Sequence, residues 1–495
     1  MRDLKKCPES IEENIPDSVI IKKMTKYLLI NPNTVKPPVA PLGIEYLASF
    51  LKERGVEVEI FDMNIQDEDY LTEILKNYGP DVTGISVRNI DDSCFATQES
   101  FLHDIKALVY RIKTVLPKTM VVLGGVGFST MPLDVLSFTG ADIGIYGDGE
   151  EGLLGLSQNT GRCVLQEIPN IVFSKRMGRS GYFNLKDFFP RRGFIDNRFY
   201  FHNGGMVGIE TSRGCNRDCI YCADPIAKGR KIRLRNPQSI IDEFEQLLYM
   251  GIDHFHTCDC EFNFVREHVI DICERIIERG YGEHLHWYAY CVVDGFDEEL
   301  AEIMKKAGCE GINFGVDHTD DEILKFYRRR HRLKDIRKAV NACRKAGIRV
   351  MLDLLLGAPG ETLDTMRKLF EDMKSVEPTR VGVSYGIRIY PNTEFHNFLK
   401  RSGYAFSENL FLPAFFIEPK ILSDIDRLIS KMVEGDEIFF FNSREQSEKN
   451  YNYNANEILT EAITKEGYRG AFWDILYRKY EDSKNNLEAK LRNIS

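Results

Sequence analysis

The feature that most constrains the fold is a regular alternation of short apolar runs with amphipathic, helix-like segments. Over residues 26–160, runs typical of strands occur at 27–31, 56–61, 82–87, 121–123 and 142–146. Strands that alternate with helices form βαβ units, which predicts a doubly wound parallel sheet of the Rossmann-like kind. Such sheets bind ligands at the carboxyl ends of their strands. We therefore expect a ligand crevice built from residues 31–41, 86–92, 124–129 and 147–151.

A second series of the same alternation follows a linker over 161–204 that is rich in Gly, Arg and Phe. Its strands are expected at 206–211, 252–257, 285–290, 311–315, 348–356 and 381–389. Six such repeats predict a partial (β/α)6 barrel of the TIM type over 205–395, with its site on the carboxyl ends of the strands. The C-terminal segment, 396–495, has mostly helical periodicity, and residues 1–25 read as a polar extension. The predicted fold class is therefore α/β.

Composition limits the classes of function. Lys and Arg total 65 against 75 Asp and Glu in 495 residues, a formal charge of −10, which argues against a nucleic-acid partner. No run approaches the ~18 apolar residues of a membrane span, and the first residues lack the apolar core of a secretory signal. The sequence thus predicts a cytoplasmic enzyme without a membrane partner. In such a compartment, clustered cysteines suggest a metal rather than disulfides.

Three of the 12 cysteines form such a cluster. Cys215, Cys219 and Cys222 have C-x3-C-x2-C spacing directly after the first barrel strand. Three thiolates around a [4Fe–4S] cluster leave one iron open to a substrate or cofactor. A structural zinc site that recruits His254 or His256, in a protein without turnover, is the main alternative. Coincidental buried cysteines are improbable at this spacing.

This motif, with the aromatic Tyr221 before its last cysteine, resembles the signature of radical S-adenosylmethionine (SAM) enzymes. The resemblance covers about 205–395. It implies that the three cysteines hold a [4Fe–4S] cluster whose open iron binds SAM. It also implies an external electron donor and cleavage of SAM to methionine and a 5′-deoxyadenosyl radical. Further candidates for SAM contacts follow at successive strand ends: Tyr221, Asp259, Glu261, Asp317, Gly357 and Arg388. The family's usual Gly-Gly-Glu is absent, so Asp259 and Glu261 stay alternatives.

The unit at 26–160 resembles the cobalamin-binding domain that precedes the barrel in a large subclass of these enzymes. The candidate cofactor residues lie at the strand ends: Ser86, Arg88, Gly124, Gly125, Gly127, Gly147, Gly149 and Glu150. Gly124 and Gly125 would let the backbone approach a flat ligand. The only histidine of the unit, His103, lies outside any Asp-x-His-x-x-Gly motif, so we expect no histidine on cobalt. A nicotinamide dinucleotide is disfavoured because the first turn lacks G-x-G-x-x-G.

Together the two resemblances imply a cobalamin-dependent radical SAM methyltransferase. It would methylate an unactivated carbon of a peptide, a protein side chain or a small metabolite, by way of the adenosyl radical and methylcobalamin. A non-methylating radical rearrangement or cyclisation with the same cofactors is the alternative enzyme. Two further features are expected to be structural. Cys258 and Cys260 read as buried strand cysteines, and the basic stretches 228–235 and 327–332 as solvated faces, although Arg233 or Arg235 could bind a SAM carboxylate.

Overall fold

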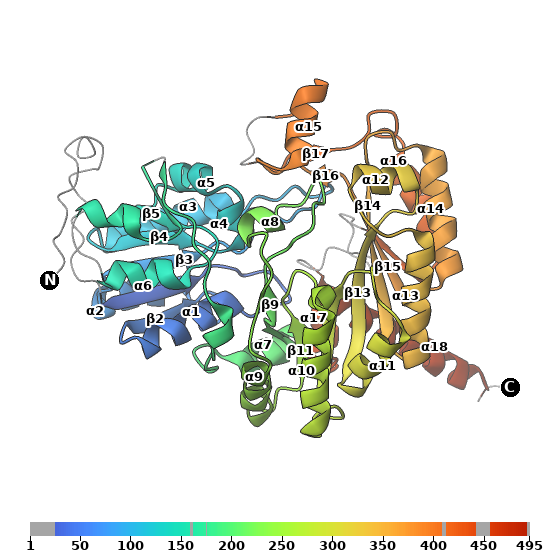
Figure 1. Cartoon of the computed structure of the whole chain (residues 1–495), viewed down its shortest axis with the longest axis horizontal. Coiled ribbons are helices and arrows are strands. Elements are labelled where there is room, and N and C mark those ends of the chain that lie inside the picture. The colour runs from blue at the N-terminus through green and yellow to red at the C-terminus, as the bar shows by residue number, and fades with distance from the viewer. Residues whose placement is uncertain (1–24, 159–161, 175, 408–411, 442–455, 493–495) are drawn as a thin grey trace.

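The computed structural model describes residues 25–158, 162–174, 176–407, 412–441 and 456–492. These form two lobes, each built on a seven-stranded sheet, joined side by side along the carboxyl ends of the strands of the first sheet (Figure 1). The expected N-terminal extension lies outside the described residues, apart from Thr25. The α/β fold class predicted from the alternation of strands and helices is confirmed.

The first sheet has the strand order β2-β1-β3-β4-β5-β6-β7, and its first five strands are parallel. A 2-1-3-4-5 order places the topological switch point between β1 and β3, where doubly wound sheets bind ligands. The last two strands are antiparallel additions from the linker. The strands are β1 (Lys26–Asn31), β2 (Glu57–Asp62), β3 (Val82–Ser86), β4 (Met120–Gly124), β5 (Ile143–Ile145), β6 (Ile171–Phe173) and β7 (Arg176–Met177).

Helices cover both faces of this sheet because successive residues of its strands are apolar on both sides. In β1, Leu28 and Ile30 pack toward one helical layer, whereas Tyr27 and Leu29 pack toward the other. The first layer contains α2 (Glu68–Tyr78), α3 (Leu102–Val115) and α5 (Pro132–Thr139), and the second contains α1 (Leu42–Glu53) and α6 (Glu150–Gln158). The short α4 (Val126–Thr130) follows β4.

The second sheet is an open, all-parallel partial barrel with the strand order β18-β15-β14-β13-β12-β11-β8. Six of its strands match the expected series: β8 (Val207–Ile209), β11 (His254–Thr257), β12 (His286–Cys291), β13 (Cys309–Asp317), β14 (Arg349–Leu356) and β15 (Arg380–Tyr385). The seventh, β18 (Phe439–Phe441), was not predicted and comes from the C-terminal segment. This strand lies outside the alternation of strands and helices from which the other six were predicted.

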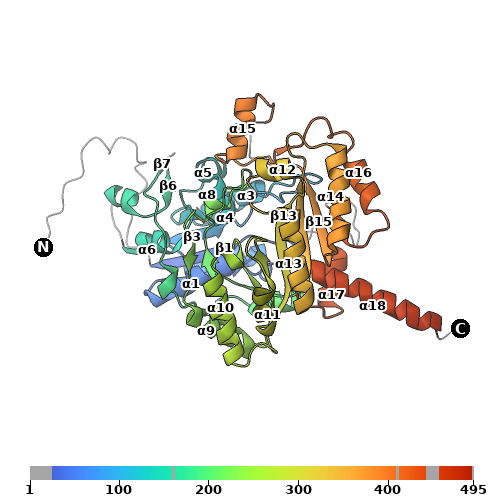
Figure 2. The ribbon, with the colours of Figure 1, turned by 45° about the vertical axis from the view of Figure 1, so that its right-hand side comes forward.

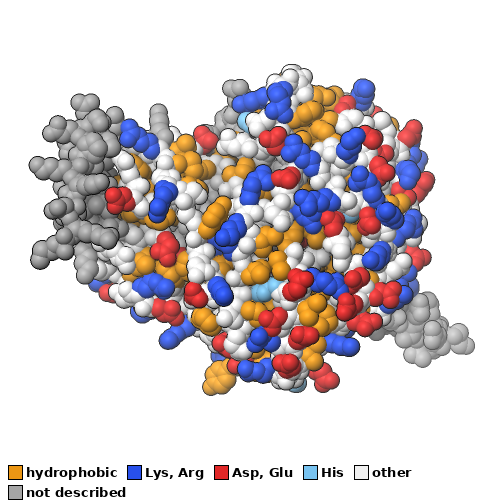
Figure 3. All heavy atoms as spheres, viewed as in Figure 1, with side chains coloured by type: hydrophobic (Ala, Val, Ile, Leu, Met, Phe, Trp, Pro, Cys, Tyr) orange, Lys and Arg blue, Asp and Glu red, His pale blue; other side chains and the backbone are white. Residues whose placement is uncertain are grey.

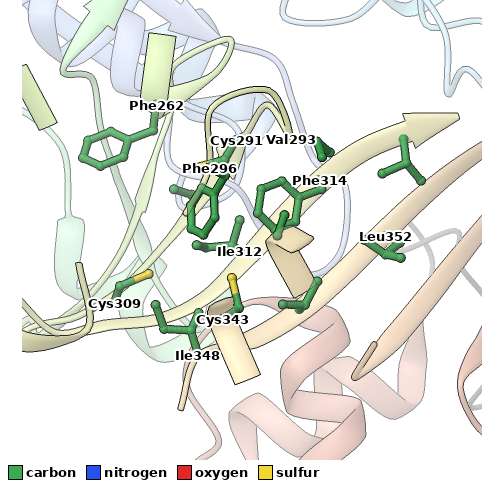
Figure 4. Packing of buried hydrophobic residues seen from close by; sticks show 14 of the residues in the cluster. Phe262, Cys291, Val293, Phe296, Cys309, Ile312, Phe314, Cys343, Ile348 and Leu352 are labelled. Carbon is green, nitrogen blue, oxygen red and sulfur yellow. The ribbon is translucent and has the colours of Figure 1, made fainter. Parts of the chain in front are cut away.

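The main hydrophobic core of this lobe lies between the sheet and its outer helices. Figure 4 shows Phe314 and Ile312 of β13 within this layer, together with Cys291, Cys309 and Cys343, which are packed as small apolar side chains. The outer helices are α9 (Pro237–Tyr249), α10 (Arg266–Glu278), α11 (Glu298–Lys306), α13 (Leu333–Ala346), α14 (Leu363–Val376) and α16 (Ile425–Val433). Shorter elements at the strand ends are β9 (Ser212–Arg213), α8 (Asp224–Ala227), β10 (Arg233–Leu234), α12 (Asp321–Phe326), β16 (Ile387–Arg388), α15 (Glu394–Ser402) and β17 (Phe415–Phe416).

The inner face of the partial barrel is covered by the C-terminal helices α17 (Glu457–Thr464) and α18 (Phe472–Arg492), the second of which projects from the molecule in Figure 2. Trp473 packs on this face and its indole N–H donates to Asn313 Oδ1 at 2.7 Å. The Tyr288 hydroxyl donates to Asp474 at 2.7 Å. The C-terminal segment therefore closes one end of the barrel interior.

Buried ion pairs join the two lobes. Arg192 of the linker pairs with Glu45 of α1 at 2.6 Å and with Glu243 of α9 at 2.7 Å, and all three side chains are fully buried. Arg235 shares Glu243 at 2.6 Å. Because both Arg192 and Arg235 have carboxylate partners, this joint holds the lobes in a defined orientation. The helix preceding β8, α7 (Asn197–Gly204), supplies Asn197 to the same cluster.

No helix in the described ranges is long and apolar enough to span a membrane. Basic and acidic side chains are interspersed on the face shown in Figure 3.

Candidate functional site

The three motif cysteines lie in the segment that follows the carboxyl end of β8 and runs to α8. Helix α8 lies between the two lobes (Figure 1). The loop needs glycine at position 214, where φ is +102° and a side chain would collide with the backbone carbonyl of Lys231. The Cys215 N–H donates to the Gly229 carbonyl at 2.9 Å, and the Cys222 N–H to the Cys219 carbonyl at 3.2 Å. These contacts turn the loop back on itself, and, besides burial, the charges of Cys219 and Cys215 contribute to raising the pKa of the Cys222 thiol.

The donor set of this loop suits an iron–sulfur cluster. Burial raises the pKa of the Cys222 thiol, whereas a hydrogen bond from the Cys260 thiol lowers that of Cys215 to about 7. The Arg329 guanidinium Nη1 lies 3.2 Å from Cys219 Sγ. Soft thiolates with hydrogen-bond donors beside them are the ligands that iron–sulfur clusters use in proteins. The residues present therefore fit a cluster held by Cys215, Cys219 and Cys222.

The structure separates the two acidic candidates that follow β11. Asp259 accepts the backbone N–H of Thr211 and the Thr211 hydroxyl, both at 2.8 Å, so each of its carboxylate oxygens already holds the strand that leads into the cysteine loop. Glu261 differs, since its Oε2 is buried and has no hydrogen-bond partner among the described residues. Burial raises the pKa of Glu261 to about 8. Of the two, Glu261 has the oxygen left to bind a SAM ammonium group.

Asp317 and Tyr221 meet beside the cysteines. The Tyr221 hydroxyl donates to Asp317 Oδ2 at 2.6 Å, and Arg329 Nε lies 3.2 Å from the same oxygen. Asp317 has a φ of +59°, an uncommon conformation for a residue other than glycine, at an irregularity in the pairing of β13 with β14. The backbone thus turns this carboxylate toward the cysteine loop.

Of the two remaining barrel candidates, Gly357 lies in a loop beyond β14 that is held by the carboxylate of Glu361, which accepts the backbone N–H groups of Gly357 and Ala358 at 2.5 and 2.9 Å. Arg388 has a structural partner instead of a free guanidinium. It pairs with the buried Asp91 of the first lobe at 2.8 Å, so it links the two lobes.

A cavity of about 460 Å³ lies between the lobes at the switch point of the first sheet. It is lined by most of the residues proposed for cobalamin, namely Ser86, Arg88, Gly124, Gly125, Gly147, Gly149 and Glu150. Arg213, Lys228 and Cys258 of the second lobe close its other side. Gly127 is not part of its lining and lies buried in α4. His103 lies on α3 against Phe138 and is also absent from this lining.

The glycines at the end of β4 and in the turn after it also meet packing constraints within the fold. A Cβ on Gly125, where φ is +100°, would lie 2.6 Å from the carbonyl oxygen of Val87, and one on Gly127 would lie 2.8 Å from the Asn89 backbone. At Gly124 it would meet only an ordinary contact at 3.6 Å. Gly125 and Gly127 therefore let β4 and its following turn pack on the backbone after β3, which shapes the cavity wall.

Glu150 lines the interdomain cavity and is also held by an ion pair. Arg213, two residues before Cys215, binds Glu150 at 3.0 Å and Asp148 at 2.9 Å, and it also pairs with Glu210 at 2.9 Å. This cluster connects the 147–151 loop of the first lobe to the cysteine loop of the second. Sequence reasoning missed Arg213, because an arginine beside a motif gives no indication of its partners.

Several expectations about structural residues were wrong. Cys258 is exposed in the interdomain cavity, and Cys260 lies beside Cys215, so the two thiols diverge. Arg233 and Arg235 are buried and pair with Asp148 and Glu243, so neither belongs to a solvated face. The two histidines of the zinc alternative lie within β11 itself. The His254 ring lies against the His286 ring, with centroids 4.7 Å apart.

A second cavity, of about 800 Å³, adjoins the first at Ser86, Arg88 and Asn89. Its walls are the loop after β1, the start of α3 and one side of α17. The carboxyl ends of the first sheet thus face two adjoining cavities, one bounded by the cysteine lobe and the other by the C-terminal helix α17.

Comparison with protein families matches both lobes. The radical SAM superfamily matches residues 209–373, and the B12 binding domain matches residues 29–157. The first range runs from the last residue of β8 through the cysteine loop and beyond β14, and the second runs from the middle of β1 through β5.

Relatives match over most of the chain. A tryptophan 2-C-methyltransferase of Streptomyces laurentii is 29% identical over 73% of this chain and 72% of its own length. An uncharacterized methyltransferase of Pyrococcus horikoshii is 26% identical over 72% of this chain and 79% of its own. The solved structure of the radical SAM methyltransferase TsrM of Kitasatospora setae, with tryptophan and a SAM analogue, has a TM-score of 0.85 at 26% identity and covers 94% of this chain and all of that one. Another structure of TsrM contains cobalamin and a [4Fe–4S] cluster, with a TM-score of 0.83 at 25% identity.

Proposed function

This chain is a cobalamin-dependent radical SAM methyltransferase, and we propose that it methylates a carbon atom of a small molecule with an indole ring. The observation that supports the substrate class is an aromatic wall on the inner face of the barrel. Tyr290 of β12 is 40% exposed there, although the strand around it is buried. Its ring lies 5.2 Å from that of His256 on β11.

Strand β11, which carries His256 of this wall, leads directly to a residue of the interdomain cavity. Alternate residues of a strand share a face, so Cys258, which lines the cavity, follows His256 on the inner side. Burial lowers the pKa of His256 to about 4, so its imidazole is neutral at physiological pH. The two rings are tilted by 56° to one another, so a planar uncharged ring such as indole can stack on one of them and meet the other edge-on. The tryptophan-methylating relative is consistent with this class.

The residues of the chain have separable tasks in this reaction. Cys215, Cys219 and Cys222 would hold the cluster, and Glu261 would bind the SAM ammonium group through its unpartnered oxygen. Ser86 and Arg88 would contact cobalamin from the end of β3. When bound, the cluster and cobalamin supply the activation of SAM and the transfer of its methyl group. Trp473 and its helix close the barrel interior and exclude water from the reacting carbon.

The test uses the full chain after anaerobic reconstitution with iron, sulfide and cobalamin. The reconstituted chain is incubated anaerobically with tryptophan, a reductant and SAM labelled in its methyl group. We expect labelled methyltryptophan and S-adenosylhomocysteine in parallel. Production of 5′-deoxyadenosine without S-adenosylhomocysteine would contradict methyl transfer and favour a rearrangement. Methylation of an aliphatic compound but of no indole would contradict the substrate class.

Tyr290→Ala and Tyr290→Phe refine the assignment. If the ring stacks on the substrate, Tyr290→Ala raises KM about tenfold, equivalent to about 1.4 kcal/mol of lost stacking, whereas Tyr290→Phe keeps KM near the wild-type value. Tyr249, which is 93% exposed on α9, is the control, and Tyr249→Ala leaves KM unchanged.

A further inference from the structure

We propose that Arg329 is a positioning residue that raises the reduction potential of the cluster by hydrogen bonding to the Cys219 thiolate, and that Asp317 opposes this effect. Arg329 lies outside the cysteine motif, in a run of arginines that reads from the sequence as a solvated face. Its Nη1 is nevertheless 3.2 Å from Cys219 Sγ, and its side chain is only 12% exposed. The proposal rests on a cluster at the three cysteines and goes beyond the methyl transfer assigned above.

The segment around Arg329 is built to aim this side chain inward. On either side, Tyr327 donates its hydroxyl to the Leu355 carbonyl at 3.0 Å, and His331 hydrogen bonds to the Val316 carbonyl at 3.0 Å. Both of these side chains are buried. The Ile220 N–H, within the cysteine loop, donates to the Tyr327 carbonyl at 3.3 Å. Two buried anchors and a direct bond to the loop therefore fix Arg329 against Cys219.

Arg329 also takes part in a network of contacts with Asp317 and Tyr221. Its Nε lies 3.2 Å from Asp317 Oδ2, which accepts the Tyr221 hydroxyl at 2.6 Å. Tyr221 lies two residues after Cys219, and its ring packs edge-on against Tyr327 at 5.3 Å. A Cβ on Gly315 would come within 3.3 Å of Arg329 Nη2, so glycine there leaves room for the guanidinium. The guanidinium thus bridges a ligating sulfur and a carboxylate at the end of β13.

The sign of the effect follows from electrostatics. Reduction adds one negative charge to the cluster, and hydrogen bonds to its sulfurs and nearby positive charge stabilise the reduced form. Arg329 supplies both, so it raises the potential. Asp317 carries a negative charge that partly cancels that of Arg329, so it lowers the potential. Opposite signs for two residues in contact distinguish this role from a purely structural one.

The experiment is a potentiometric titration of the anaerobically reconstituted full chain without SAM, followed by electron paramagnetic resonance of the reduced cluster. Arg329→Gln is expected to shift the midpoint potential to a more negative value, and Arg329→Lys to recover part of the shift. Asp317→Asn is expected to shift it to a more positive value. Asn tolerates the left-handed backbone of position 317, so this variant probes charge without new strain.

Arg330→Gln is the matched control, since it removes the same charge from the next residue, whose side chain is exposed, and should leave the potential unchanged. Iron and sulfide are quantified first, so that loss of the cluster is distinguished from an intact cluster whose potential does not depend on Arg329. Shifts of the same sign in Arg329→Gln and Asp317→Asn, or shifts no larger than that of Arg330→Gln, would overturn the proposal.

Discussion

At the scale of single residues, the cluster ligands and the glycines that shape the cobalamin side carry the most specific expectations. Cys219 is the middle one of the three proposed ligands and also receives the Arg329 hydrogen bond. Cys219→Ala removes one of three thiolates, so we expect the reconstituted chain to lose most of its iron and its cluster absorption, measured by iron analysis and ultraviolet–visible spectroscopy. Cys343→Ala, in the apolar core of α13, is the control and should keep the wild-type iron content while losing stability. Full iron retention by Cys219→Ala would remove this cysteine from the site.

Gly125 tests the packing of the turn after β4. Gly125→Ala places a Cβ against the Val87 carbonyl at a positive φ, so the free energy of unfolding should fall by about 1–3 kcal/mol, measured by urea denaturation. Displacement of the backbone after β3 should also weaken cobalamin binding, because Ser86 and Arg88 lie there. Gly43 is the control: it is in α1 with no atom within 4 Å of an added Cβ, and Gly43→Ala should not lower stability. Equal stability of the two variants would contradict this role of Gly125.

Much of the residue-scale chemistry was predictable from the sequence, but the partners of charged residues were not. The spacing of Cys215, Cys219 and Cys222 predicts the cluster ligands, because local spacing decides whether three thiols can converge. Glu150 and Arg388, in contrast, looked like cofactor contacts and are ion-paired across the lobes with Arg213 and Asp91. A partner distant in sequence leaves no signal in the motif that contains the residue.

At the scale of elements, we expect the buried ion pairs between α1, the linker and α9 to stabilise the contact between the lobes more than any other ion pair. Arg192→Ala leaves Glu45 and part of Glu243 as unpaired buried charges, so the free energy of unfolding should fall by about 3–5 kcal/mol. The neighbouring Arg191 is the control, because it is 77% exposed and lies 3.6 Å from the half-exposed Glu53. Arg191→Ala should change the free energy of unfolding by no more than about 1 kcal/mol. Urea denaturation of both variants measures the difference. Similar values for the two would show that the joint does not stabilise the fold.

Strands within the two predicted alternations were found, whereas strands outside them were not predicted. The predicted runs overlap β1–β5, β8 and β11–β15, but their bounds differ, as at 381–389 against Arg380–Tyr385 of β15. The three residues of β18 pair with β15 only because the chain returns to the edge of the barrel after α16. That pairing extends the second sheet beyond the range of 205–395 expected for the barrel.

At the scale of the whole molecule, the two lobes face each other across the interdomain cavity, which adjoins a second cavity beside α17. The first sheet presents its switch point, the second presents the cysteine loop, and the C-terminal helices close the barrel behind them. The order of these units along the chain was predictable, whereas their relative orientation depends on ion pairs that only the folded structure reveals.

The cofactor content of the intact chain tests this arrangement most directly. After anaerobic reconstitution with iron, sulfide and cobalamin and removal of unbound material, we expect about four iron and four sulfide with one corrinoid per chain, and a spectrum containing both chromophores. Cys219→Ala should keep the corrinoid and lose the iron, because the two groups occupy different lobes. A colourless chain that retains neither inorganic sulfide nor corrinoid, or one that binds a single zinc ion in their place, would contradict the assignment.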